Sequence, residues 1–449
     1  METLSVEIVI KILENLSKET LKVVRLTSKE LSALASPLLF NRVYASSHLH
    51  DLEVLSSISR HPVLSLHVRE IVFCGMFFHS SGIKTNNKSI PEDDLENGRQ
   101  YYKSRLDEQN ETLSSKEDLV IISTALARMP NIQMVVLTNH WLPTRDLLNH
   151  CDYETRVYGP EGQYGEGPYG DARSGGPLSR CYPRFAEKPD GWQQFIPGKI
   201  SKYIRIDHGF TVMCQALSIA QVPVQMLSID YSDPVMMDTA AIPGIYVGSF
   251  CVTLRMLNHF INAFRHLRKM SFSLFLYGFD HDCDMSDDMD NHTDEWLALM
   301  EGNVAKVFTA ATDLEELAID FTDKMHRITL NNFWGDHTWH RLRSLKLFRK
   351  RMYQNEMVEL IRRHCKTLEV LHLYSIVIHG GGWPEVADVM RECVALRSLS
   401  FGRLGERVDH NNVKPVIIEN LEEYVLRGGL GPIYDPDYRP QTPICASLD

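Results

Sequence analysis

A repeated pattern of apolar residues in the second half of the chain constrains the fold more than any other feature. The pattern is L-x-x-L-x-L, in which the last two apolar positions alternate as they do along a strand with one buried face. Helical patterns fall between the copies, at residues 353–365 and 383–394. Because one strand and one helix cannot bury their apolar faces alone, we predict a stack of such units with parallel strands. The clearest copies begin at Leu314, Leu342, Leu368, Leu396 and Leu421, in steps of 28, 26, 28 and 25 residues.

This spacing resembles that of leucine-rich repeats, whose units of about 20–29 residues each supply one strand and one helix. Looser copies at residues 132–137, 224–229 and 267–272, and a possible first strand within residues 63–73, extend the pattern upstream. The Asn or Cys that usually follows the strand is not present consistently. We therefore predict an irregular α/β solenoid with parallel strands inside and helices outside. The alternative is a leucine-rich core of some other α/β fold.

The first forty residues predict three short helices with more apolar surface than they can bury. We expect Ser5 and Ser17 to cap the first two helices, Thr27 and Glu30 to form a capping box, and Pro37 to break or kink the third helix. Three helices of this length make a poor independent domain, so we expect a partner to cover part of their surface. In the first helix, an arc of about 140° holds five apolar residues: Ile8, Val9, Ile12, Leu13 and Leu16.

This N-terminal segment resembles an F-box, the motif with which receptor subunits bind the adaptor of SCF-type ubiquitin ligases. The family pattern begins Leu-Pro-x-Glu-Ile, where residues 4–8 of this chain read LSVEI, with Ser5 in place of proline. An Ile-Leu pair follows at residues 12–13, and RLTSK at residues 25–29 is similar to the Arg-Leu-Val-Ser/Cys-Lys stretch of the family. The ending SPLLFNRVY, residues 36–44, is similar to fungal F-box proteins. The alternative is that residues 1–45 only form a helical cap on the repeats.

The resemblance implies a non-catalytic substrate receptor that binds a Skp-type adaptor and, through it, a cullin–RING ligase. The implied adaptor contacts are Leu4, Ser5, Ile8, Ile12, Leu13, Leu16, Leu21 and Leu26. Residues between the repeat leucines would face the target protein in two columns, which offer cationic and aromatic side chains. The columns are Ala318, Lys346, His372, Ser400 and Val425, and Asp320, Phe348, Tyr374, Gly402 and Arg427. The target-binding residues we select are Asp320, Lys346, Phe348, His372, Tyr374 and Arg427.

The predicted organisation is an F-box at residues 1–45, a connecting helix or linker at 46–60, the repeats at 61–430 and a tail at 431–449. Insertions interrupt the repeats near residues 78–117, 140–205 and 279–294. The second insertion is rich in Gly, Tyr and Pro, and loops of its length are usually functional or disordered. Two alternatives to the receptor remain open: a non-ligase interaction scaffold, and an enzyme that uses this insertion as a lid.

Composition and motifs predict no catalytic residue, cofactor or metal site. The net charge of −11 disfavours a nucleic-acid binder. Nine singly scattered cysteines favour reduced thiols in the cytoplasm or nucleus, and no apolar run reaches the about 18 residues that span a membrane. A G-x-G-x-x-G at residues 165–170 lacks its strand and helix, and the acidic loop at residues 280–291 lacks the Gly and Glu of an EF-hand. The basic run at residues 340–351 is a candidate site for an acidic or phosphorylated peptide.

Overall fold

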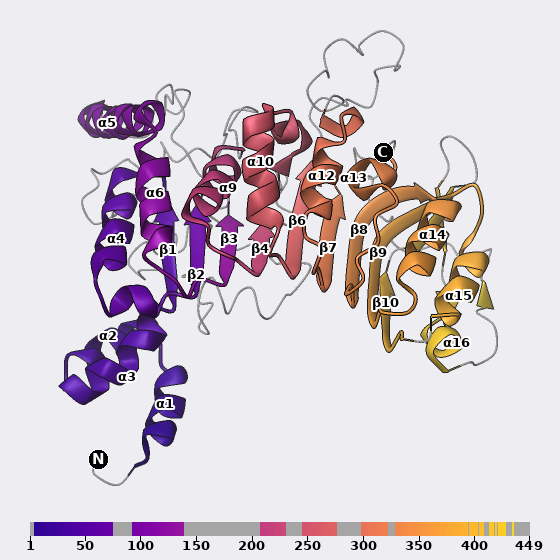
Figure 1. The fold of residues 1–449 in the computed structure, drawn as a ribbon, viewed down its shortest axis with the longest axis horizontal. Coiled ribbons are helices and arrows are strands. Elements are labelled where there is room, and N and C mark those ends of the chain that lie inside the picture. The colour runs from indigo at the N-terminus through magenta and orange to yellow at the C-terminus, as the bar shows by residue number, and fades with distance from the viewer. Residues whose placement is uncertain are drawn as a thin grey trace. The chain divides into compact units, whose positions relative to one another are not determined.

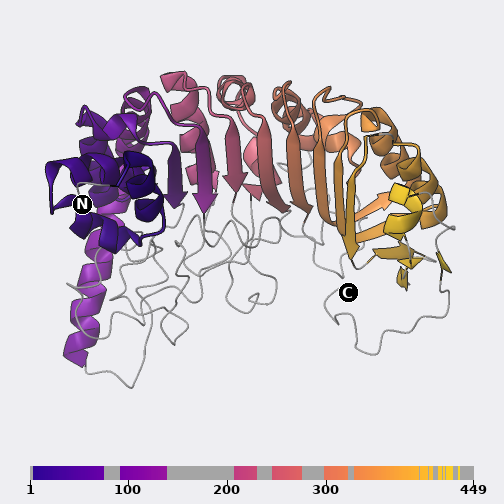
Figure 2. The same ribbon diagram turned by 90° about the horizontal axis from the view of Figure 1, so that it is seen from below.

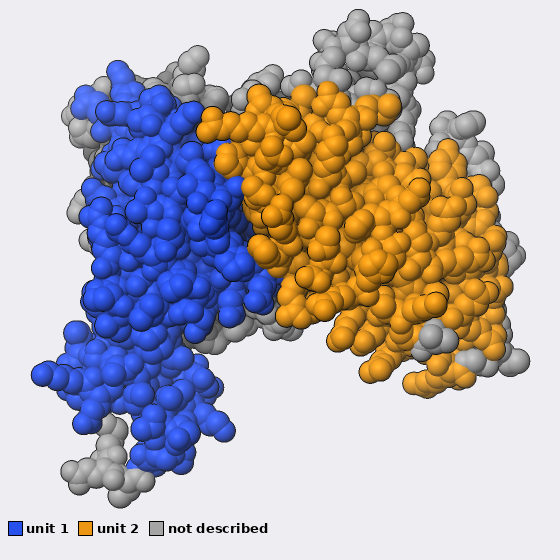
Figure 3. All heavy atoms as spheres, viewed as in Figure 1, with its two compact units in different colours: residues 1–244 blue, residues 245–449 orange. Residues whose placement is uncertain are grey.

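The computed structural model shows two compact units, residues 1–244 and residues 245–449, each with parallel strands and helices (Figure 3). Within them, the structure describes residues 4–74, 92–138, 207–229, 245–275, 298–321, 328–393, 395–402, 404–407, 413–416, 418–419, 421–427 and 433–434.

The first unit begins with three short helices, α1 (Val6–Glu14), α2 (Lys18–Arg25) and α3 (Lys29–Phe40) (Figure 1). Their common core is small and consists of Leu13, Leu21, Ala35 and Leu39. Ser17 caps α2 as predicted, because its hydroxyl accepts a hydrogen bond from the Thr20 amide at 3.2 Å.

Two predictions about these helices are wrong. The N-cap of α3 is Ser28, whose hydroxyl accepts a hydrogen bond from the Leu31 amide at 3.1 Å, whereas the Thr27 hydroxyl donates to the Val24 carbonyl. Helix α3 also continues through Pro37 to Phe40. A proline inside a helix costs about 3 kcal/mol, and packing of the last turn into the core offsets that cost. Ser5 holds the N-cap position of α1, but its side chain makes no capping hydrogen bond.

Four strands of the first unit pair in parallel and in chain order: β1 (Arg42–Ser46), β2 (Glu70–Cys74), β3 (Met134–Thr138) and β4 (Met226–Ile229). Strand β1 was not predicted and begins inside the segment assigned to the F-box. The first predicted strand starts only at Glu70. The helical elements between the strands are α4 (Leu49–Arg60), η1 (Leu64–Leu66), α5 (Glu92–Ser115), α6 (Glu117–Ala127) and α9 (Asp207–Ala220). Helix α5 occupies most of the first predicted insertion.

The second unit continues the alternation of strands and helices. Its strands are β5 (Ile245–Tyr246), β6 (Lys269–Phe275), β7 (Glu316–Phe321), β8 (Ser344–Tyr353), β9 (Val370–His379), β10 (Ser398–Gly402), β11 (Leu404–Arg407), β12 (Val413–Val416), β13 (Ile418–Glu419) and β14 (Ile433–Tyr434). Its helical elements are η7 (Val247–Phe250), α10 (Leu254–Phe264), α12 (Asn303–Thr309), α13 (Asn331–Trp334), α14 (Gln354–His364), α15 (Trp383–Arg391) and α16 (Leu421–Arg427).

Strands β6 to β9 of this unit pair in parallel, each with the next. Strand β5 joins β6, while β10 and β11 pair with successive halves of β9. Antiparallel pairing appears only at the end of the described chain, between β11 and β12 and between β13 and β14. The helices lie along one face of the strands (Figures 1 and 2).

The L-x-x-L-x-L pattern correctly predicts β3, β4, β6, β7, β8, β9 and β10, and α14 and α15 lie where helices were expected. The leucines of one unit align with those of the next: Leu317 pairs in register with Leu345, and Leu345 with Leu371. All three are buried. The fifth copy is wrong, because Leu421 begins helix α16 and not a strand.

Strands β8 and β9 share a kink at the same register position. Arg349 and Ser375 both have φ of 52°, a left-handed conformation that residues other than glycine seldom adopt. The kink breaks the strand alternation, so the side chain of Lys350 is buried. Its ammonium donates to the Ile328 carbonyl and lies 5.4 Å from the centre of the Phe321 ring. Burial lowers the pKa of Lys350 to about 7, although nearby Glu356 acts in the opposite direction.

We predict that Lys350 makes the stability of the protein depend on pH. Between about pH 7 and pH 10.5 the unfolded chain binds a proton that the folded chain has lost, so the free energy of unfolding rises with pH. Relative to Lys350→Met, the wild type should therefore gain up to about 3 kcal/mol between pH 7 and pH 9.5, measured by urea unfolding. The partly exposed Lys346→Met is the matched control. Wild-type and Lys350→Met curves that stay parallel would contradict the prediction.

Candidate functional site

Helix α1 carries two apolar faces that point in different directions. Leu4, Ile8 and Ile12, spaced four residues apart, are 46%, 47% and 49% exposed. On the other face Leu13 is buried, and Val9 packs on the core of the three helices. A helix with one apolar face can bury it against its neighbours, so the second face indicates a surface for another molecule.

The exposed apolar surface extends beyond α1. Leu26, at the end of α2, is 81% exposed, and Val6 and Val23 are also exposed. Single exposed apolar side chains are ordinary. Six within residues 4–26, next to so small a core, form a candidate binding surface. We call it the N-terminal apolar surface: Leu4, Val6, Ile8, Ile12, Val23 and Leu26.

The structure separates the predicted adaptor contacts into two groups. Leu4, Ser5, Ile8, Ile12 and Leu26 are exposed. The other three need a corrected role: Leu13 and Leu21 are buried in the core that joins the helices, and Leu16 is partly buried against it. They hold the exposed residues in place and do not themselves form the contact surface.

The predicted target columns are partly confirmed as structural rows. Strand pairing aligns Ala318, Lys346, His372 and Ser400 in one row, and Asp320, Phe348, Tyr374 and Gly402 in the next. The fifth member of each row is wrong, because Val425 and Arg427 belong to helix α16.

Burial further narrows the predicted target surface. Asp320 is buried, and its Oδ1 accepts a hydrogen bond from Nε of Arg349 at 2.7 Å. Phe348 is also buried, which leaves Lys346, His372 and Tyr374 partly exposed.

His372 is held rigidly within this row. Its Nδ1 is hydrogen-bonded to the Ser400 hydroxyl at 2.5 Å, and its ring stacks on Phe348 with 5.2 Å between ring centres. Burial, followed by the charge of Lys346, lowers the pKa of His372. A neutral histidine and an aromatic cluster suit contact with a protein surface.

A row of alternating charges crosses the strand starts of the second unit. We call it the charge ladder, and it consists of Arg268, Glu315, Arg343, Glu369 and Arg397. Each residue immediately precedes its strand, and each backbone amide donates to the carbonyl of the preceding member at 2.7–2.8 Å. Nε of Arg268 contacts Oε1 of Glu315 at 3.0 Å, and Arg343 lies 3.9 Å from Glu369. The corresponding positions in the first unit are Asn41, Arg69, Gln133 and Gln225.

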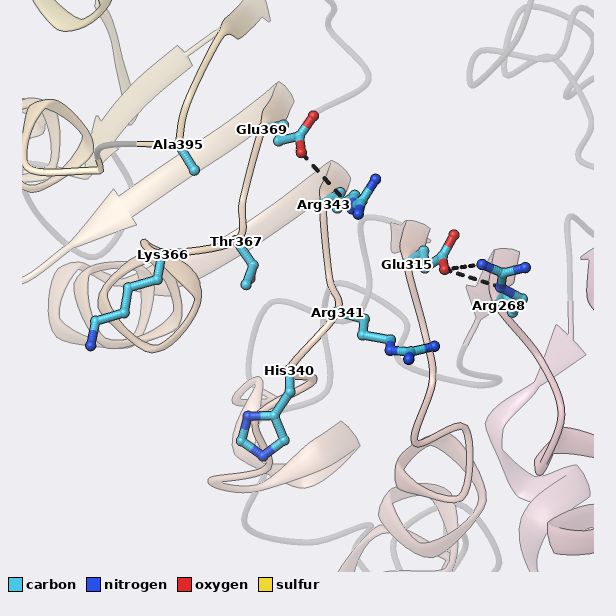
Figure 4. Close-up of a pocket in the computed structure, with 9 residues that line it drawn as sticks. All are labelled: Arg268, Glu315, His340, Arg341, Arg343, Lys366, Thr367, Glu369 and Ala395. Atoms are coloured by element: carbon cyan, nitrogen blue, oxygen red, sulfur yellow. Dashed lines mark hydrogen bonds and ion pairs between the residues drawn. The ribbon is translucent and has the colours of Figure 1, made fainter.

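A pocket of about 500 Å³ opens beside the charge ladder (Figure 4). Four members of the ladder line it, and the loops before β8 and β9 add further cationic side chains. The lining therefore combines four Arg and Lys side chains with two carboxylates. The full set is Arg268, Glu315, His340, Arg341, Arg343, Lys366, Thr367, Glu369 and Ala395. The predicted basic run contributes His340, Arg341 and Arg343.

A buried serine, aspartate and histidine meet in the first unit, where the sequence pattern predicted no site. Oδ2 of Asp118 accepts a hydrogen bond from the Ser47 hydroxyl at 2.9 Å and lies 2.6 Å from Nε2 of His208. In a hydrolytic triad the histidine bridges the other two groups, whereas here the aspartate does. The geometry therefore fits a structural tie between the end of β1, the start of α6 and the start of α9.

Several predicted features lie outside the described residues: the insertions near 140–205 and 279–294, the glycine-rich match at 165–170 and the acidic loop at 280–291. Across the described part of the chain, no group of three or more His, Cys, Asp and Glu side chains is arranged to hold a metal ion. None of the described helices has both the length and the hydropathy needed to cross a bilayer.

Comparison with known proteins leaves the chain without a family assignment. No protein-family model matches the sequence, and no curated protein matches it significantly.

We predict that the charge ladder stabilises the second unit through its paired members. In a double-mutant cycle, Arg268→Gln and Glu315→Gln should show a coupling of about 0.5–1 kcal/mol in urea unfolding, and 1 M salt should reduce it. The control cycle is Arg341→Gln with Asp313→Asn, a pair 3.4 Å apart whose side chains are both more than half exposed. Its coupling should be near zero. Equal couplings in the two cycles would mean that the ladder is only a surface feature.

Proposed function

We propose that the chain is the substrate-recognition subunit of an SCF-type, cullin–RING ubiquitin ligase. The observation that carries the proposal is the N-terminal apolar surface. Its members Leu4, Ile8 and Ile12 occur at positions of the F-box pattern and are exposed on α1. In this proposal α1 to α3 form an F-box that binds a Skp-type adaptor.

The departure at Ser5 is compatible with this proposal. Ser5 has φ of −66° and ψ of 152°, an extended conformation that proline also adopts. The backbone at this position therefore has the geometry that the family's proline would impose. The Ser5 side chain makes no capping hydrogen bond that a proline would remove.

We further propose that the strand–helix units form a leucine-rich-repeat domain that binds the target protein. The support is the step of 26–28 residues between successive strand patterns from Leu314 to Leu396, the parallel register and the helices along one face. The receptor contributes no reacting group. It raises the effective concentration of target lysines near the conjugating enzyme, which is sufficient to accelerate transfer.

We predict that Ile8→Asp with Ile12→Asp abolishes co-purification of a Skp-type adaptor. Two carboxylates on the exposed face of α1 would have to be buried without partners in the complex. Leu13 is left unchanged because it lies in the core, where a charge would unfold the helices. The measurement is adaptor recovery from cells that express the tagged full chain.

The matched control for this experiment is Val120→Asp with Leu254→Asp, two exposed apolar residues outside the N-terminal helices. The control should retain the adaptor. Undiminished adaptor recovery by the α1 variant would reject the F-box proposal. Ubiquitination of a co-purified partner that depends on residues 1–45 then distinguishes a ligase receptor from a non-ligase scaffold.

A further inference from the structure

The pocket beside the charge ladder has features of a binding site that the F-box resemblance does not assign. We propose that it binds an acidic segment of a partner protein, with a glutamate or aspartate carboxylate placed between Arg341, Arg343 and Lys366. The inference deepens the proposed function and rests on it for the identity of the partner as a target. The chemistry of the pocket can be tested without the adaptor.

The first step concerns which cations remain for a ligand. Within the charge ladder, Arg268 and Arg343 face Glu315 and Glu369. Arg341 contacts only the exposed carboxylate of Asp313, at 3.4 Å. Lys366 makes no ion pair with any described residue. The close-up shows Arg341 and Lys366 on separate loops on either side of Thr367 (Figure 4).

The second step concerns the groups that would hold the anion. Backbone amides often bind anions, but at this edge the amides of Arg343 and Glu369 already donate to the ladder carbonyls. Recognition must therefore come from side chains. The planar guanidinium of an arginine binds a carboxylate through two parallel hydrogen bonds, and a lysine adds a point charge.

The third step selects a carboxylate over a phosphate. Glu315 and Glu369 line the same pocket, and Asp313 lies next to Arg341. These carboxylates limit the excess of positive charge, so a single negative charge fits better than the nearly double charge of a phosphate monoester. The net charge of −11 also disfavours a polyanion such as nucleic acid.

The fourth step concerns size. Ligand pockets commonly measure about 300–1,000 Å³, and this one measures about 500 Å³. That volume accepts one or two side chains of a peptide. Because the cationic groups lie at an exposed edge of the strands, the affinity should fall as salt increases.

The test uses the full-length chain and fluorescein-labelled peptides, followed by fluorescence anisotropy. One peptide carries three glutamates in a glycine–serine background, the second has glutamines in their place, and the third has phosphoserines. The pocket variant is Arg341→Gln with Lys366→Gln. Arg255→Gln with Arg265→Gln removes the same charge from exposed positions at α10 and serves as the control. Equal urea midpoints for both variants will show that each is folded.

We expect saturable binding of the glutamate peptide and none of the glutamine peptide. The pocket variant should weaken binding about tenfold or more, while the control should stay within about twofold. Binding of the glutamate peptide weaker than about 1 mM, or equal losses in the two variants, would overturn the proposal. Phosphoserine binding more than about tenfold tighter would overturn the carboxylate assignment.

The adaptor experiment keeps the two proposals separable. The pocket variant should still recover the adaptor, and Ile8→Asp with Ile12→Asp should still bind the glutamate peptide. Loss of peptide binding in the α1 variant would mean that the acidic peptide binds the N-terminal helices, and would overturn the pocket assignment.

Discussion

Burial of the repeated apolar positions against the helices determines the rest of this structure. Leu317, Leu345 and Leu371 occupy the same register position on neighbouring strands, and all are buried. A slip of one residue would turn each buried side chain to the opposite face, so the strands have only one favourable alignment. The positions of all other side chains on the strands follow from that alignment.

The fixed register explains how isolated residues in the sequence become continuous features. The second position of each L-x-x-L-x-L unit precedes a strand, so Arg268, Glu315 and Arg343 meet although they are far apart along the chain. The charge ladder, the pocket beside it and the row around His372 are all consequences of stacking similar units. The paired kink at Arg349 and Ser375 has the same origin, because one strand can bend there only if its neighbour bends too.

The sequence predicted the strand–helix alternation well because period-2 apolar patterns separated by helical patterns are strong signals. It failed at Leu421, where Leu-x-x-Tyr-x-Leu fits a strand but Leu421 and Val425 also have helical spacing. Both are buried in α16. Strand β1 was missed because its residues, 42–46, overlap the end of the F-box resemblance.

The candidate surfaces could be predicted only in part. A helical wheel places Ile8, Ile12 and Leu13 in one apolar arc, but it cannot show that only Leu13 faces the helices' own core. Burial of Asp320 likewise depends on Arg349, in the next strand. The charge ladder, by contrast, is readable in the sequence once the second position of each repeat is compared.

Hydrogen–deuterium exchange of the full chain, with and without a purified Skp-type adaptor, tests the central claim most directly. If α1 and the end of α2 present the binding surface, adaptor should slow amide exchange in residues 4–16 and 23–26 and leave strands β6 to β10 unchanged. Unchanged exchange in α1 at saturating adaptor, or protection confined to the strands, would contradict the account.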